Sequence, residues 1–236
     1  MTQAPVHAPD HPTVEPLAPP LGPPVDDRPA ARPQPVVLEG RLGRVEKLAS
    51  RHCDNLWAVL DGHDAVWAYM SYGPFPDGGA FAAWLATREE LADPYSYAIL
   101  DRSGRAFGIA TLMEIRPAMR VIEVGHIVLS PRLQRTPLAT EAQYLLGRYV
   151  FETLGYRRYE WKCNALNAAS RRAALRFGFA PEGIFRQHMI VKGRSRDTAW
   201  FSILDSEWPA RKAAFERWLA PENFDRDGRQ KTKLGG

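Results

Sequence analysis

The stretch LSPRLQRTPLATEAQYLL, residues 129–146, decides the fold because it joins the end of a strand to the start of an amphipathic helix. Thr136 is a good N-cap residue, and Pro137 then takes the first helical position, where its missing N–H costs little. The residue before a proline is pushed toward extended backbone, which also suits an N-cap. We therefore predict a helix from Pro137 to about Leu154 that starts at the end of a strand.

The start of this helix is a potential anion site. Free N–H groups and the positive end of the helix dipole point outward from it. Ser130, Gln134 and Arg135 add polar groups to the same turn. Most capped helix starts bind nothing, however, so this stretch alone does not decide whether a phosphate binds here.

Around this helix the hydrophobic periodicity changes repeatedly between that of strands and that of helices, which is typical of an α/β or α+β fold. Strands are expected over 36–49, 95–100, 106–115, 120–130 and 156–163, and a hairpin over 184–204 that turns near Lys192 and Gly193. Further helices are expected over 53–60, 76–94 with Asp77 as the cap, 167–178 and 205–219.

The two ends of the chain lack this pattern. Residues 1–35 are crowded with proline and nearly lack aromatic residues, so they cannot bury enough apolar surface to offset the entropy of ordering. We expect a disordered or polyproline-like tail there and a polar C-terminal tail over 221–236. A single domain of residues 36–220 remains between them.

Composition excludes several classes of protein. The chain of 236 residues is 45% hydrophobic and 25% charged, and no apolar run approaches the roughly 20 residues of a membrane span. Its first residues resemble no secretory signal, and two cysteines do not form a disulfide framework. We expect a cytoplasmic protein that does not enter a membrane.

The charge balance suggests an anionic ligand without requiring one. The net charge is +4, from 31 basic and 27 acidic residues, and no run of five or more basic residues occurs. A nucleic-acid-binding function would rest on this charge alone, so no nucleic-acid partner is expected.

Two stretches together resemble one superfamily. EVGHIVLSPRLQRTPLATEA, residues 123–142, and KCNALNAASRRAALRFGF, residues 162–179, are similar to motifs of the GNAT superfamily of acetyl-CoA-dependent N-acetyltransferases, most of all its RimJ/RimL-like branch. The resemblance implies a mixed, mostly antiparallel seven-stranded sheet flanked by helices. Its fourth and fifth strands would splay apart, with coenzyme A in the gap.

The resemblance also implies a cofactor site. In the segment QRTPLA, residues 134–139, the family's first loop glycine is replaced by Pro137, which removes one backbone donor. By resemblance Asn167 contacts the pantetheine arm, although it could simply cap a helix that Ser170 helps to start. The residues expected at acetyl-CoA are Val128, Leu129, Gln134, Arg135, Thr136, Leu138, Ala139, Thr140, Asn167, Ser170, Arg171 and Arg172.

Glu123 is the first candidate for the catalytic base. Its offset from Gln134 resembles that of the catalytic glutamate of histone-type members, and burial on a central strand would raise its pKa. It could instead be a structural carboxylate paired with an arginine of a neighbouring strand. His126 is the second candidate, and strand alternation predicts that only one of the two faces the substrate.

The remaining chemistry needs hydrogen-bond donors. A backbone N–H near Val128 or Leu129 is expected to bind the oxygen of the tetrahedral intermediate. Many members have a tyrosine that protonates the leaving thiolate, but here its position is Ala174. Ser170 could replace it, or the thiolate could leave without an acid.

The acceptor site is less defined. Tyr69, Tyr72 and Phe75 lie in the connection that, by resemblance, covers it, although clustered aromatic residues are more often core. Arg186 could flank the same cleft or be a surface charge. We expect a protein N-terminus or a small-molecule amine as acceptor, no metal, and a monomer or homodimer. The alternative is an acyl-CoA-binding module with lost or reduced catalysis.

Overall fold

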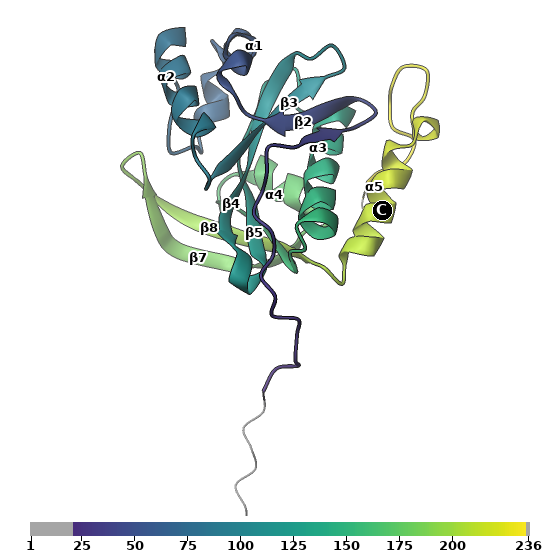
Figure 1. Cartoon of the computed structure of the whole chain (residues 1–236). Helices are drawn as coiled ribbons and strands as arrows, with labels where there is room; N and C mark the ends of the chain where they lie inside the picture. The colour runs from purple at the N-terminus through teal and green to yellow at the C-terminus, as the bar shows by residue number, and fades with distance from the viewer. Residues whose placement is uncertain (1–20, 235–236) are drawn as a thin grey trace, which may run out of the picture.

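The computed structural model describes residues 21–234, which form an eight-stranded sheet flanked by helices (Figure 1). The strand order is β1-β2-β3-β4-β5-β6-β8-β7, and every neighbouring pair is antiparallel except β5 and β6. The strands are β1 (Val37–Glu39), β2 (Gly43–Lys47), β3 (Tyr95–Asp101), β4 (Ala106–Arg116), β5 (Val121–Leu129), β6 (Arg158–Asn164), β7 (Ala180–Val191) and β8 (Arg194–Leu204). The mixed, mostly antiparallel sheet is thus confirmed.

Helices cover both faces of the sheet and bury two separate cores. The helices are α1 (Cys53–Leu60), α2 (Gly78–Glu89), α3 (Pro137–Arg148), α4 (Ala168–Arg176) and α5 (Trp208–Leu219). On β3, Ala98 and Leu100 pack with α1 and α2, whereas Tyr97 and Ile99 pack in the core that contains α3, α4 and α5. This alternation is the expected one for a strand buried on both faces. No helix within residues 21–234 is long and apolar enough to cross a membrane.

The eighth strand arises because the segment expected as one strand over 36–49 folds into two. The chain turns at 40–42, and β1 pairs with β2 as a hairpin. The carboxylate of Glu141 on α3 accepts hydrogen bonds from the backbone N–H groups of Arg41 and Leu42, both at 2.8 Å. A buried side chain 100 residues away therefore holds this turn, and no local pattern indicates it.

The predicted helix starts are confirmed. Thr136 has extended backbone and its hydroxyl accepts a hydrogen bond from the N–H of Ala139 at 3.2 Å, with Pro137 as the first helical residue. Asp77 caps α2 in the same way. The helix expected to run to Leu154 is α-helical only to Arg148 and continues as one π-helical turn over Tyr149–Thr153.

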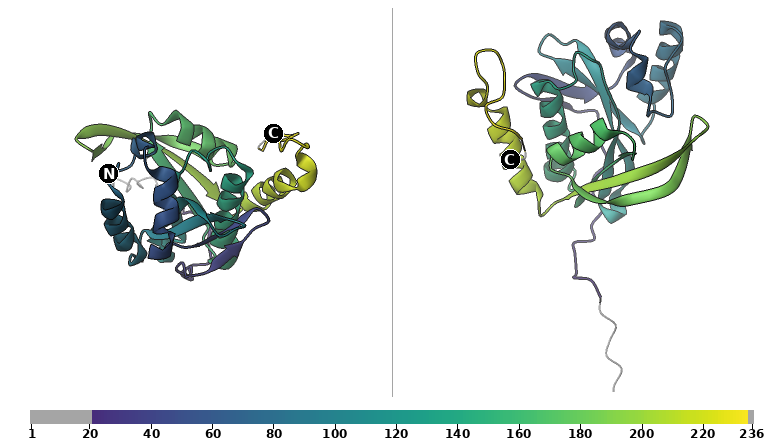
Figure 2. Two further views of the ribbon diagram at one scale, coloured as in Figure 1. Left: turned by 90° about the horizontal axis from the view of Figure 1, so that it is seen from above. Right: turned by 180° about the vertical axis from the view of Figure 1, so that it is seen from behind.

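The predicted splay is present, between β5 and β6. The parallel ladder runs from Val121 and Arg158 to Val124 and Trp161, where it stops although both strands continue. The last part of β5 leads to the start of α3, and β6 leads to α4. These two helices lie on the same side of the sheet in both views of Figure 2.

Parts of the two expected tails contact the domain. Residues 1–20 lie outside the described residues, but the N–H groups of Ala30 and Ala31 donate to the carbonyls of Pro117 and Leu154. At the other end the indole of Trp218 donates to Gln230 at 2.8 Å, and Leu234 is buried. The expectation of tails over 1–35 and 221–236 did not include these contacts, and the division into domains stays a prediction.

Candidate active site

A β-bulge at His126 shapes the centre of the site. Thr111 on β4 pairs with Gly125, and Ile109 pairs with Val128, so that two residues of β5, His126 and Ile127, lie opposite one residue of β4. His126 has φ of 46°, in the left-handed region. The bulge lies just beyond the point where β5 and β6 separate, and it changes which face each following side chain occupies.

The bulge brings Glu123 and His126 to one face of the sheet, which corrects the expectation that only one of them faces the substrate. Before the bulge, Ile122 and Val124 pack in the α3 core, so Glu123 between them points to the α1–α2 side. After it, Val128 packs in the α1–α2 core. The ring of His126 lies 5.5 Å from that of Tyr72, which packs against the same core.

Glu123 is a buried carboxylate in an ion pair, though the partner is not the arginine that the structural alternative predicted. Only 1% of the residue is exposed, and its Oε2 lies 2.9 Å from Nζ of Lys162 on β6. Burial raises the pKa of Glu123 to about 7, while the charge of Lys162 opposes the shift. A carboxyl group with this pKa exchanges a proton near neutral pH, as a general base must.

His126 is held neutral. Burial, together with the positive charges of Arg88, Lys162 and Arg196, lowers its pKa to about 4. Its buried Nδ1 has no hydrogen-bond partner among residues 21–234. The imidazole therefore carries no charge at neutral pH, and its unshared nitrogen is a polar group on the same face of the sheet as Glu123.

Sequence reasoning missed Lys162, Trp200 and Arg196. Lys162 and Trp200 pair in register across β6 and β8, and Nζ of Lys162 lies 5.3 Å from the centre of the Trp200 ring. Glu160 pairs with Glu123, and Lys162 is two residues after Glu160 on the same strand. The Lys162 side chain therefore points to the face of the sheet that Glu123 occupies. No local motif indicates these three residues, because only the sheet register brings them to Glu123.

The edge of β5 offers backbone groups to the gap. Ser130 donates its N–H to Phe107, directly opposite on β4, at 3.1 Å. Because hydrogen-bonded pairs alternate along an antiparallel ladder, Val128 also bonds to β4, whereas Leu129 points its N–H and C=O the other way. The Leu129 carbonyl accepts from Nε2 of Gln134 at 3.0 Å. Of the two expected oxyanion donors, Leu129 is thus the one directed at the gap.

The start of α3 has fewer free donors than expected. The N–H of Thr136 bonds to Leu133, that of Ala139 to the Thr136 hydroxyl, and that of Thr140 to the Thr136 carbonyl. The N–H groups of Arg135, which has φ of 62°, and Leu138 have no partner within residues 21–234. These two amides, with the Arg135 side chain beside them, fit a pyrophosphate at this turn.

On α4 the structural roles of Asn167 and Ser170 are visible. The side chain of Asn167 caps the helix by accepting from the N–H of Ser170 at 3.0 Å, and the hydroxyl of Ser170 accepts from the Trp161 indole at 3.0 Å. Arg171 and Arg172 are exposed on the first turns of the same helix. Their placement fits phosphate binding, and the roles predicted for these four residues stay predictions.

The expected aromatic cover divides into two parts. Tyr72 lies beside His126, and the hydroxyl of Tyr69 donates to the Leu166 carbonyl before α4 at 3.3 Å. Phe75 instead packs against Trp67 in the α1–α2 core. Arg186 is exposed on β7, with no hydrogen bond or ion pair to the part of the chain that the structure describes. The residues brought to the site are Tyr69 and Tyr72.

Comparison with known proteins agrees with this geometry. The model of the acetyltransferase (GNAT) domain matches residues 44–180, more than half of the chain. The chain belongs to the GNAT family. Members of this family transfer an acetyl group from acetyl-CoA, and no cluster of potential metal ligands occurs within residues 21–234.

Solved structures extend the match to most of the chain. A GCN5-related N-acetyltransferase from Brucella melitensis is 49% identical, with a TM-score of 0.85 over 88% of this chain and 96% of that one. A probable acetyltransferase of the GNAT family from Chromobacterium violaceum is 41% identical, with a TM-score of 0.76 over 83% of this chain and 100% of that one. The RimL acetyltransferase of ribosomal protein L7/L12, at 16% identity and a TM-score of 0.64, shares the fold.

One relative carries a different name. A protein of Acidiphilium cryptum called ribosomal RNA large subunit methyltransferase H is 32% identical over 127 residues, 52% of this chain and 77% of that protein. The family model and the structural matches, which cover more of this chain, all indicate acetyl transfer. The GNAT assignment therefore rests on the larger and better-supported match.

Proposed function

We propose that this GNAT protein transfers the acetyl group of acetyl-CoA to a primary amine, with Glu123 as the base. The observation that carries the proposal is the buried Glu123 carboxyl group with its pKa near 7, at the point where β5 and β6 separate. A base in that place lies on the same strand as Leu129, whose backbone N–H points to the gap between β5 and β6. The acceptor is a protein N-terminus or a small molecule.

The reaction is a direct attack. The amine, freed of a proton by Glu123, forms an N–C bond to the carbonyl carbon of the thioester, and the C–S bond then breaks. The Leu129 N–H is placed to bind the carbonyl oxygen as it becomes negative. The sulfur leaves as a thiolate and takes up a proton, so one amide and one free thiol result.

Acetyl-CoA supplies the activated acetyl group, and residues of this chain bind and orient acetyl-CoA. The N–H groups of Arg135 and Leu138 are free to bind the pyrophosphate, and Asn167 is expected to contact the pantetheine arm. Pro137 removes the donor that would stand between them. The proposed site therefore has a stiff loop with two amide donors.

The test compares the protein with Glu123→Gln, which keeps the shape of the side chain and removes the base. Release of the coenzyme A thiol is followed with a panel of peptides, amino acids and polyamines, and acetyl-CoA binding is titrated by calorimetry. We expect unchanged binding of acetyl-CoA and a turnover lowered at least 100-fold, the scale of general base catalysis. In the unaltered protein kcat/KM should rise as pH increases through about 7.

Two outcomes would contradict the proposal. If Glu123→Gln loses acetyl-CoA binding as well as turnover, the carboxylate is structural. Tight binding of acetyl-CoA with no transfer to any amine of the panel would support the alternative, an acyl-CoA-binding module, which the restricted loop at Pro137 also favours.

A further inference from the structure

One wall of the site carries an arginine with no anion beside it. Arg196, Thr198 and Trp200 alternate along β8 and so project from the same face. Trp200 pairs in register with Lys162, whose amino group reaches both the Trp200 ring and Glu123. We call this face of β8 the wall of the site. It runs from Trp200, beside the Lys162 that is paired with Glu123, through Thr198 to Arg196.

The guanidinium of Arg196 is poorly satisfied by its surroundings. Its Nε is buried and has no hydrogen-bond partner among residues 21–234, and the same residues place no carboxylate within ion-pair distance of it. Burial lowers the pKa of Arg196, and Glu123 is close enough to oppose that shift. Glu123 is already paired with Lys162, so it does not neutralise the arginine.

The surrounding charges are mainly positive. Arg88 of α2, Lys162 and Arg196 all lower the pKa of His126, so all three positive charges act on this neutral ring. Lys162 is paired with Glu123 and Glu114. Arg88, like Arg196, has no ion-pair partner in the described part of the chain. Two positive charges thus remain without a counter-charge in the acceptor region, by which we mean the surroundings of Glu123, Tyr72, His126 and Arg196.

Aromatic rings border this charge. Phe185 of β7 lies 5.2 Å from Trp200, and Tyr72 covers the opposite side beside His126. The imidazole of His188 is already hydrogen-bonded to Thr198 at 3.0 Å, whereas Nε of Arg196 and the indole Nε1 of Trp200 have no partner within residues 21–234, and of these two donors only Arg196 is charged. A charged group of the acceptor that reached Arg196 would be partly shielded from water, which strengthens its interaction with the guanidinium.

We propose that the acceptor is an amine that also carries a carboxylate, and that Arg196 binds this carboxylate while the amine lies at Glu123. The proposal rests on the acetyl transfer proposed above and names its substrate class. A guanidinium binds a carboxylate through two parallel hydrogen bonds, which fixes the direction of the acceptor. A polyamine would meet repulsion from Arg88 and Arg196. The carboxylate can belong to a free amino acid or to an acidic first residue of a peptide.

The test measures acetylation of matched acceptors. One arm compares L-amino acids with their carboxamides, and the other compares tripeptides beginning with aspartate or glutamate with those beginning with asparagine or glutamine. We expect kcat/KM to favour the carboxylate in one arm by roughly 10- to 100-fold, the range for a hydrogen bond between charged groups. The arm that shows the preference identifies the source of the carboxylate.

Variants assign the preference to Arg196. In Arg196→Gln the carboxylate should lose most of its advantage in kcat/KM over the neutral partner, and Arg196→Lys should restore part of that advantage. Arg217→Gln, which removes an exposed charge on α5, is the matched control and should behave as the unaltered protein.

The failures can be told apart. Acetyl transfer without a preference for carboxylates, or a preference that survives in Arg196→Gln, overturns the assignment of Arg196 and leaves acetyl transfer intact. Absence of transfer to every amine overturns the proposed function. In that case stabilisation of the fold by the same acceptors still tests Arg196, because carboxylates should raise the melting temperature more than amides, and only when Arg196 is present.

Discussion

At the scale of single residues, Glu123 makes stability depend on pH. Its pKa is about 7 in the folded protein and 4.5 when unfolded, so the folded state holds the proton more tightly. The stability that this proton contributes is complete below pH 4.5 and is lost as pH rises through 7. Relative to Glu123→Gln, the protein should lose roughly 3 kcal/mol between pH 4.5 and 8.

Urea denaturation of both proteins at pH 4.5 and pH 8 measures this difference. Glu123→Gln keeps every other titratable group, so the comparison of the two proteins leaves the pH dependence to Glu123. If the free energies of unfolding of the two proteins differ by the same amount at both pH values, folding does not raise the pKa of Glu123.

Single residues were predictable where the signal is local. Thr136 and Pro137 specify the start of α3 by their own backbone preferences, and the structure confirms it. The bulge at His126 has no such signal, since a histidine, and not a glycine, adopts the positive φ there. Arg196 and Arg186 are equally basic in sequence, and only the folded structure distinguishes Arg196, half-buried on β8, from Arg186, exposed on β7.

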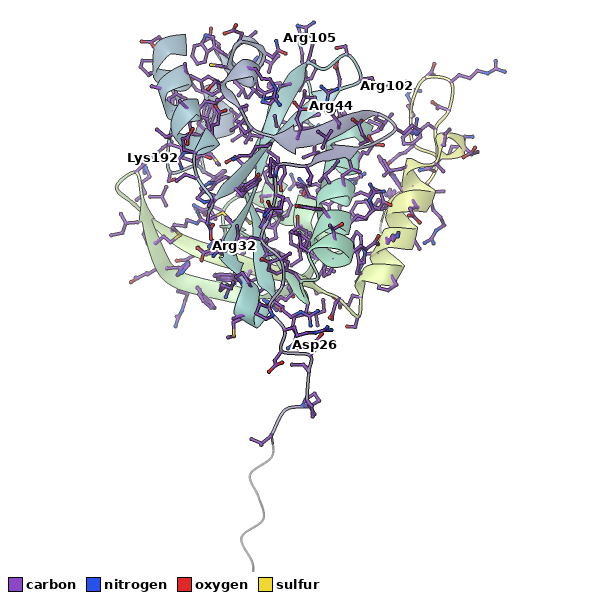
Figure 3. The ribbon with its side chains drawn as sticks, viewed as in Figure 1. Asp26, Arg32, Arg44, Arg102, Arg105 and Lys192 are labelled. Carbon is purple, nitrogen blue, oxygen red and sulfur yellow. The ribbon has the colours of Figure 1, made fainter. Side chains whose placement is uncertain are left out.

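At the scale of elements, the β7–β8 hairpin reaches from the sheet to the cover of the acceptor region. The long hairpin curves away from the body, with Lys192 at its tip (Figure 3). Nζ of Lys192 donates to the Trp67 carbonyl at 3.0 Å, in the short helix Asp64–Trp67 before α2. Because Phe185 and Arg196 belong to this hairpin, the contact fixes one wall of the acceptor region against its cover.

Lys192→Met should loosen this wall and leave the acetyl-CoA side intact. We expect the KM for the acceptor to rise by a few-fold, in line with the loss of one hydrogen bond of about 1 kcal/mol. Amide hydrogens near the hairpin tip should exchange faster, and the KM for acetyl-CoA should not change. Arg194→Met is the control, since Arg194 is exposed on the same hairpin and its side chain makes no hydrogen bond or ion pair to residues 21–234. An identical effect of both changes would rule out the Lys192 contact as the cause.

At the scale of the whole molecule, the order of helices and strands could be predicted from periodicity, but contacts between distant segments could not. The expected first strand divides because Glu141, far along the chain, binds the turn between its halves. The residues before β1 and after α5 lack hydrophobic periodicity, yet Pro33 and Leu234 are buried against the domain. Composition predicts which segments cannot fold alone, and says nothing about a surface on which they lie.

The segment before β1 should therefore contribute to the stability of the whole fold. Besides the bonds of Ala30 and Ala31, the N–H of Gln34 donates to the Tyr149 hydroxyl at 3.0 Å, and Arg120 donates to the Asp26 carbonyl at 3.1 Å. Removing residues 1–35 breaks these bonds and exposes the groups that they cover, whereas removing residues 1–20 keeps all of them. The longer deletion should lower the free energy of unfolding by about 3 kcal/mol relative to the shorter one, at roughly 1 kcal/mol for each backbone donor. Calorimetry should then show a melting temperature lower by roughly 6 to 12 °C, and equal melting temperatures would mean that these bonds only replace bonds to water.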